Sequence, residues 1–152
     1  MTTEFAEVND LFLTLIEDYR INLIYQTSGS ATLNTYLEGW LIYSVGEFVD
    51  LCNQDLSYNL SAQQFNETLT SENINILAQI MTKYWFTKLT QDILQVNVNI
   101  VDHDFKTFSQ AQNLKEKRDY LNNKKEEISQ LLQNYAYKYN QWDNWNTQIF
   151  GG

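Results

Sequence analysis

The amino-acid sequence predicts an all-α fold: a bundle of about four helices with a long C-terminal helix and an extended aromatic C-terminal tail. The chain has no proline and only five glycines, two of them at the very end, so little in its interior breaks a helix. Hydrophobic residues make up 43% of the 152 residues and aromatic residues 14%, which is enough large apolar surface for one folded core.

The first two helices are predicted at about 9–25 and 32–53, where apolar residues recur at three- and four-residue steps. Asn9 and Asp10 are of the residue types that cap a helix N-terminus. The polar segment 26–30 is predicted to break the chain between the two helices. Five aromatic residues fall on the helical stripes and are expected in the core: Tyr36, Trp40, Phe48, Tyr84 and Trp85.

Residues 54–70 are polar and irregular, and this pattern predicts a connecting loop from which Phe65 and Leu69 reach the core. A third helix is predicted at about 71–94, because Thr70 and the residues that follow it supply an N-cap and a first-turn acid. Residues 94–100 then alternate strictly between apolar and polar types, which indicates an isolated strand.

The last helix is predicted from Asp104, as its cap, to about residue 138. At 1.5 Å per residue it would be roughly 50 Å long, too long for one small core to cover entirely. These elements predict a helical domain over residues 1–136 and a C-terminal tail over 137–152.

Aromatic and apolar residues are crowded into the predicted tail, with no further element beyond it to pack against. Large amphipathic aromatics are common interface anchors, so we expect a partner protein to bind them. The alternative is that the tail folds back on its own bundle. The residues concerned are Tyr137, Tyr139, Trp142, Trp145, Ile149 and Phe150.

The net charge of −9 is unevenly distributed along the chain. Residues 1–80 carry eleven acids and one base, whereas residues 81–152 carry eight acids and nine bases, so the two halves have charges of −10 and +1. Bases cluster in one stretch of the last helix, which could be solvated helix surface, a nucleic-acid site or an inter-subunit contact to the acidic half of another copy. That stretch contains Lys115, Lys117, Arg118, Lys124 and Lys125.

No pattern in the sequence predicts catalysis, a cofactor or a metal. The only histidine, His103, stands between Asp102 and Asp104 without further ligands at a defined spacing. The few glycines form no phosphate-binding loop, so we expect a protein that is not an enzyme. Cys52 is the only cysteine, the N-terminus lacks a secretory signal, and no apolar run is long enough to span a bilayer, so an intracellular protein without membrane contact is expected.

Three stretches of the sequence, in this order and spacing, resemble the head–tail connector (neck adaptor) proteins of tailed bacteriophages. They are 36–42 (YLEGWLI), 71–78 (SENINILA), and 104–115 with its DFK and SQAQNLK segments. The resemblance covers about residues 8–135 and is carried by helical patterns, with no catalytic signature.

The resemblance implies a structural virion protein, made in the host bacterial cytoplasm and located at the head–tail connector. Such adaptors form a ring of about twelve copies between the portal and the stopper or tail proteins. Their C-terminal segment reaches toward the portal, and genome DNA passes through the channel without specific binding. The alternatives are another neck or tail-completion protein, or a helical regulator that binds a host protein.

Overall fold

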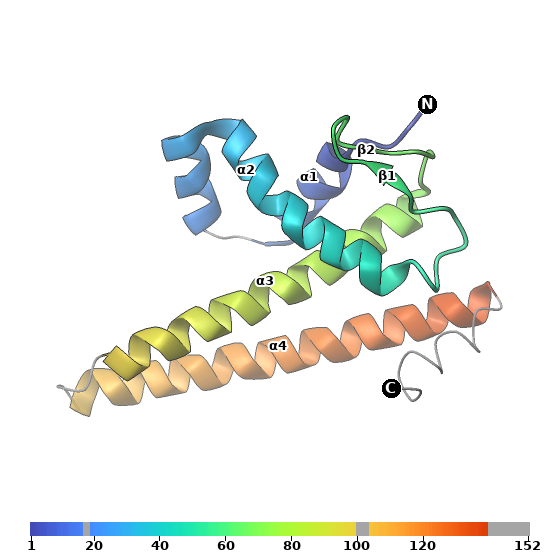
Figure 1. Ribbon diagram of the computed structural model, residues 1–152. Helices are drawn as coiled ribbons and strands as arrows, with labels where there is room; N and C mark the ends of the chain where they lie inside the picture. Colours follow the sequence, from blue (N-terminus) through green and yellow to red (C-terminus); the bar gives the residue numbers. More distant parts are fainter. Residues whose placement is uncertain (17–18, 100–103, 140–152) are drawn as a thin grey trace.

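The computed structural model describes residues 1–16, 19–99 and 104–139. The all-α prediction is confirmed, because four helices and one two-stranded antiparallel hairpin make up the described elements (Figure 1). Within these residues no helix is both long and apolar enough to cross a membrane. The elements are α1 (Phe5–Leu15), α2 (Tyr19–Phe48), β1 (Tyr58–Asn59), β2 (Gln64–Phe65), α3 (Ser71–Asn99) and α4 (Asp104–Lys138).

Helix α3 is the centre of the fold, because it packs against each of the other three helices. Helices α3 and α4 lie side by side and antiparallel along most of their length (Figure 1). Side-chain contacts fix this register, since Glu72 at the start of α3 meets Lys138 at the end of α4, and Gln79 meets Lys124 further along. The bounds of α4 agree with the predicted 104–138, so the long C-terminal helix is confirmed.

A single apolar core joins the four helices and the loop. Phe48 and Trp85 belong to it as predicted, whereas Trp40 and Tyr84 pack against its edge and are only partly buried. The side chain of Tyr36 lies outside the described residues. Phe65 and Leu69 of the connecting loop are both buried, which confirms their predicted place. The largest fully buried side chains include Phe5, Phe12, Leu37, Leu41, Ile76, Leu77, Ile80 and Met81.

The predicted start of the first helix is wrong. Helix α1 begins at Phe5, where Glu4 and Glu7 form a reciprocal capping box between side chains and backbone. Asn9, predicted as a cap, instead lies inside the helix and is buried. The helix also ends earlier than predicted, because Ile16 adopts an extended conformation (φ −116°, ψ 131°) directly after Leu15.

Two further predictions about chain breaks are also wrong. The polar segment 26–30 lies within α2, although the N-terminal part of this helix runs in a different direction from the rest (Figure 1). A single glycine costs only about 1 kcal/mol in a helix interior, so the segment does not end the helix. The change of direction is a bend within one helix. Residues 94–99 of the predicted strand belong to α3, and residue 100 lies outside the described residues. An isolated strand would leave its backbone groups unpaired, whereas helix continuation satisfies them.

The loop after α2 contains a short hairpin that the sequence did not predict. Tyr58 pairs with Phe65, and Gln63 in the turn has a positive φ of 55°. The hairpin also holds the N-terminus, because Phe5 donates its N–H to the Gln63 carbonyl (2.9 Å) and Phe65 donates its N–H to the Thr3 carbonyl (2.8 Å). The start of α1 is therefore fixed by the loop that leads to α3.

Candidate functional site

The C-terminal end of α4 is attached to the loop that follows α2. Tyr135 is 2% exposed, and its hydroxyl accepts a hydrogen bond from the backbone N–H of Asn53 (3.0 Å) and donates one to the Asn53 Oδ1. Its ring packs edge-to-face on Phe48, with 5.1 Å between ring centroids. Burial raises the pKa of the Tyr135 hydroxyl, which keeps it protonated as a donor. The last turns of α4 are thereby fixed to the core.

The same loop is fixed to the start of α3 by side-chain amides. The Nδ2 of Asn73 donates hydrogen bonds to the Gln54 Oε1 (2.7 Å) and to the Asn53 Oδ1 (3.2 Å). Gln54 also accepts the backbone N–H of Thr70 (2.8 Å). Thr70 in turn caps α3, since its Oγ accepts the N–H of Asn73 (3.2 Å), which confirms the predicted cap. Three elements therefore meet in one hydrogen-bonded junction: the loop after α2, the start of α3 and the end of α4.

Cys52 lies beside this junction, with its Sγ 3.8 Å from the Tyr135 hydroxyl. Burial raises the pKa of the Cys52 thiol. A raised pKa disfavours the reactive thiolate, so Cys52 acts here as a small packed side chain.

The first residues of the predicted tail are held by Glu72. Tyr139 donates its hydroxyl to the Glu72 Oε2 (2.7 Å), and Lys138 pairs with the same carboxylate (3.0 Å). The Tyr139 ring stacks on Tyr135 at 4.6 Å between centroids, while Tyr137 is 71% exposed. Helix α4 thus runs two residues beyond the predicted domain boundary at 136. The other predicted anchors, Trp142, Trp145, Ile149 and Phe150, lie outside the described residues.

The hydroxyl of Tyr135 offers a direct test of the junction. We expect Tyr135→Phe to lower the free energy of unfolding by about 1 kcal/mol, because Asn53 loses a donor and an acceptor at once. Tyr137→Phe removes an exposed hydroxyl two residues away and should change stability by less than about 0.5 kcal/mol. Urea denaturation of both variants measures the difference. Equal midpoints for the two would contradict a structural role of the Tyr135 hydroxyl.

The Glu72 contacts predict a pH dependence. The hydrogen bond from Tyr139, and next to it that from Lys138, lower the pKa of the Glu72 carboxyl. A lowered folded-state pKa contributes stability that is present above the pKa of the unfolded chain and is lost as the pH falls through the folded-state pKa. We therefore expect Glu72→Gln to be less stable than the parent chain at neutral pH and equal to it in acid. Denaturation across a pH series measures this, and a difference independent of pH would contradict it.

The five bases predicted as an inter-subunit surface are all on α4 but are not equivalent. Lys115, Arg118 and Lys125 are exposed and Lys117 is partly buried. Lys124 is used within the chain, because its Nζ bonds to the Gln79 Oε1 on α3 and lies 3.7 Å from the Glu127 carboxylate. The inter-subunit role of the group remains a prediction, and Lys124 contributes to it least.

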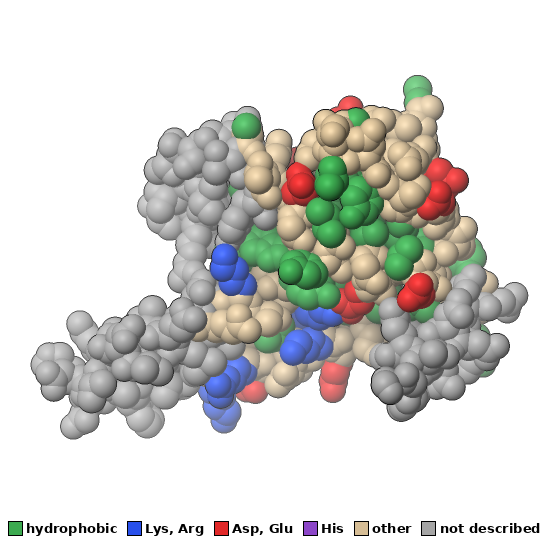
Figure 2. Space-filling view, in the orientation of Figure 1, with side chains coloured by type: hydrophobic (Ala, Val, Ile, Leu, Met, Phe, Trp, Pro, Cys, Tyr) green, Lys and Arg blue, Asp and Glu red, His purple; other side chains and the backbone are tan. Residues whose placement is uncertain are grey.

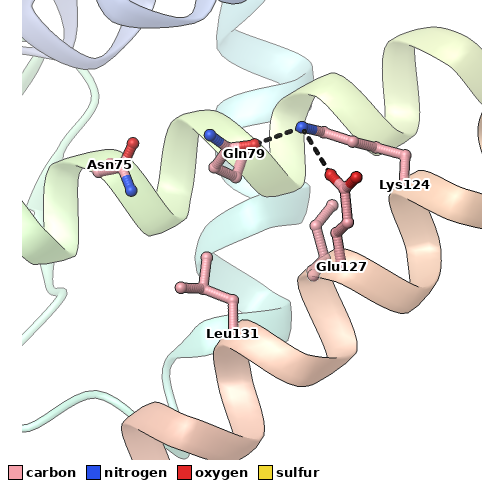
Figure 3. Close-up of a pocket in the computed structure, with 6 residues that line it drawn as sticks. Asn75, Gln79, Lys124, Glu127 and Leu131 are labelled. Carbon is pink, nitrogen blue, oxygen red and sulfur yellow. Dashed lines mark hydrogen bonds and ion pairs between the residues drawn. The ribbon is translucent and has the colours of Figure 1, made fainter.

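Lys124 also lines a pocket of about 250 Å³ between α3 and α4. Figure 3 shows that Lys124 reaches from α4 toward Gln79, with Glu127 beside it and Leu131 one turn further along the helix. The Lys124 ammonium already contacts both Gln79 and Glu127. The Lys124 ammonium therefore links α3 and α4 at this pocket through Gln79 and Glu127.

The seam between α2 and α3 is lined by aromatic and charged side chains. Glu47 of α2 accepts hydrogen bonds from Lys83 and from the Tyr84 hydroxyl (2.7 Å). Burial, and next to it the Glu47 carboxylate, raise the pKa of Tyr84. Tyr43 stacks beside Tyr84 at 5.7 Å between ring centroids, yet is 65% exposed. The outer side of α2 therefore presents a large aromatic to solvent.

Among the described residues, no group of three or more His, Cys, Asp or Glu side chains could hold a metal ion. Asp102 and His103 lie outside the described residues, so the prediction about that segment stays a prediction. No protein-family model, curated protein or solved structure matches the chain.

Proposed function

We propose that this chain is a structural protein of a tailed bacteriophage virion, a head–tail connector adaptor. In this proposal, about twelve copies form a ring between the portal and the stopper or tail proteins, and the genome passes through the channel. The resemblance of three sequence stretches suggests the family. The described residues support the proposal with a helical bundle that joins four helices in one core and exposes aromatic side chains at its surface.

The attachment of the α4 end carries the proposal. Tyr135, Lys138 and Tyr139 hold the end of α4 against the loop after α2 and the start of α3. The thirteen residues that follow, 140–152, therefore start from a fixed point on the bundle, and they include two tryptophans. Tryptophan is among the most common interface anchors, and a segment that begins at a fixed point of the bundle suits binding to an adjacent protein.

The charge of the chain supports a role beside DNA that does not involve binding it. The net charge is −9, and residues 1–80 contain a single base. Phosphates are attracted by clustered Lys and Arg, whereas an acidic channel wall repels them and lets DNA slide. The acidic half of the protein supplies enough carboxylates for such a wall.

Native mass measurement and electron microscopy of the purified protein test the proposal. We expect a closed ring with a central hole, of about twelve copies, alone or on addition of the portal protein of the same phage. A protein that stays a monomer or dimer in the presence of the portal protein would contradict the adaptor role. It would favour the alternative of a helical regulator that binds a host protein.

A further inference from the structure

One side of α2 leaves apolar residues and two glycines at the surface. Gly39, Tyr43, Gly46 and the following Val49 are exposed and Ile42 is partly buried; we call these five residues the α2 face. Tyr43 is 65% exposed and Val49 46% exposed. Figure 2 shows apolar side chains gathered over α2 on the side of the molecule facing the viewer.

The two glycines of the α2 face are unexplained by the folded chain. A Cβ atom added at Gly39 or at Gly46 would meet nothing within 4 Å. Glycine in a helix interior is unfavourable relative to alanine, so both positions weaken α2 without making room for anything in this molecule. Glycines seven residues apart on one helix face allow a second backbone to approach closely. The two glycines indicate a contact surface only together with the exposed Tyr43 and the charged residues around them.

The surroundings of the α2 face are acidic. Glu38 and Glu47 flank it on either side and Asp50 follows at its end, within a half of the chain that has a charge of −10. Glu47 is paired with Lys83, whereas the described partner of Glu38 is the neutral amide of Gln63. An apolar face with acidic flanks fits a partner surface with an exposed aromatic among bases.

The chain carries a surface of that kind on α4. Tyr120 is 49% exposed and lies within the basic stretch between Lys117 and Lys124. In one copy this stretch packs on α3, through the Tyr120 ring on Phe86 and through the Lys124 bond to Gln79. Tyr43 of the α2 face packs beside Tyr84 of α3, whereas the described side-chain contacts of the basic stretch are made with Phe86 and Gln79, so the two surfaces use different residues of α3. Figure 2 shows the visible Lys and Arg side chains over α3 and α4.

We propose that the α2 face is the docking site for the basic stretch of α4 from a second copy of this chain. The two surfaces differ, so the contact is head-to-tail, the kind that closes into a ring when the rotation between copies permits. This inference rests on the proposed function, because it assigns the copy-to-copy contact of the proposed ring.

Blocking the α2 face tests the inference. Gly46→Gln places a long side chain where close approach is needed, and we expect at least tenfold weaker self-association in sedimentation experiments. Ala6→Gln, an equivalent change at an exposed position of α1, is the matched control and should associate like the parent chain. Circular dichroism should show both variants folded, with Gly46→Gln melting no lower than the parent chain because a helical glycine is removed.

A mixing experiment identifies the occupant. Arg118→Glu combined with Lys125→Glu reverses the charge of the basic stretch and leaves the α2 face intact. Gly46→Gln blocks the α2 face and leaves the basic stretch intact. Neither variant should self-associate, but a mixture of the two should form a one-to-one dimer that cannot grow further. A mixture that stays monomeric would overturn the inference.

The outcomes separate this inference from the proposed function. Rings that form from Gly46→Gln as readily as from the parent chain would overturn the assigned contact and leave the adaptor role standing. A parent chain that neither self-associates nor assembles with the portal would contradict both. Association of the parent chain with an unrelated protein but never with another copy would also count against the inference.

Discussion

A chain that ends at Tyr139 should keep its fold and lose its assembly with neighbouring proteins. Tyr139 is the last residue with described contacts, and its bond to Glu72 and its stacking on Tyr135 stay intact in this truncation. The removed segment contains Trp142, Trp145 and two further predicted anchors. Truncating one interface anchor commonly costs 2 kcal/mol or more, so removing several should abolish binding to the portal or the next ring.

Helicity, thermal unfolding and co-sedimentation with the portal protein measure this result. A chain that ends at Tyr135 is the informative control, because it loses Lys138 and Tyr139 and should be less stable as well as unable to assemble. Full assembly by the chain ending at Tyr139 would show that the tail is not an interface. A large loss of stability in that chain would favour the alternative in which the tail folds back on its own bundle.

Phe48→Ala should lower the free energy of unfolding by about 3–5 kcal/mol, the usual cost of truncating a fully buried phenylalanine. Phe48 is 0% exposed at the end of α2 and packs on Tyr135, so its removal leaves a cavity between the core and the end of α4. Leu60→Ala, a truncation at a position that is 46% exposed, should change stability by less than about 0.5 kcal/mol. Chemical denaturation of both variants gives the comparison, and similar midpoints would refute the core position of Phe48.

The helical class and the start of α3 follow directly from local sequence signals. The absence of proline and the apolar periodicity predicted four helices, and Thr70 marked the start of α3 through a side-chain cap that the structure contains. Breaks were predicted less well. The alternation at 94–99 is a strand pattern, but the described strands pair only with each other and the helix continues through these residues. The end of α1 at Leu15 carries no glycine or proline to reveal it.

The junction at the end of α4 was not predictable from the sequence. It depends on contacts between residues 82 positions apart, such as Asn53 and Tyr135, and Asn, Gln and Tyr are common throughout this chain. The predicted basic stretch lies on one helix as expected, but only the structure places Lys124 against Gln79. The α2 face was also missed, since Tyr43 and the two glycines carry no local signal of exposure.

The location of the protein in assembled particles tests the adaptor role most directly. Tailed phage particles that carry this chain can be labelled with an antibody or with a tag fused to its N-terminus, and imaged by electron microscopy. The account predicts one ring of label at the junction between head and tail. Label elsewhere on the particle, or its absence from purified virions, would contradict the account.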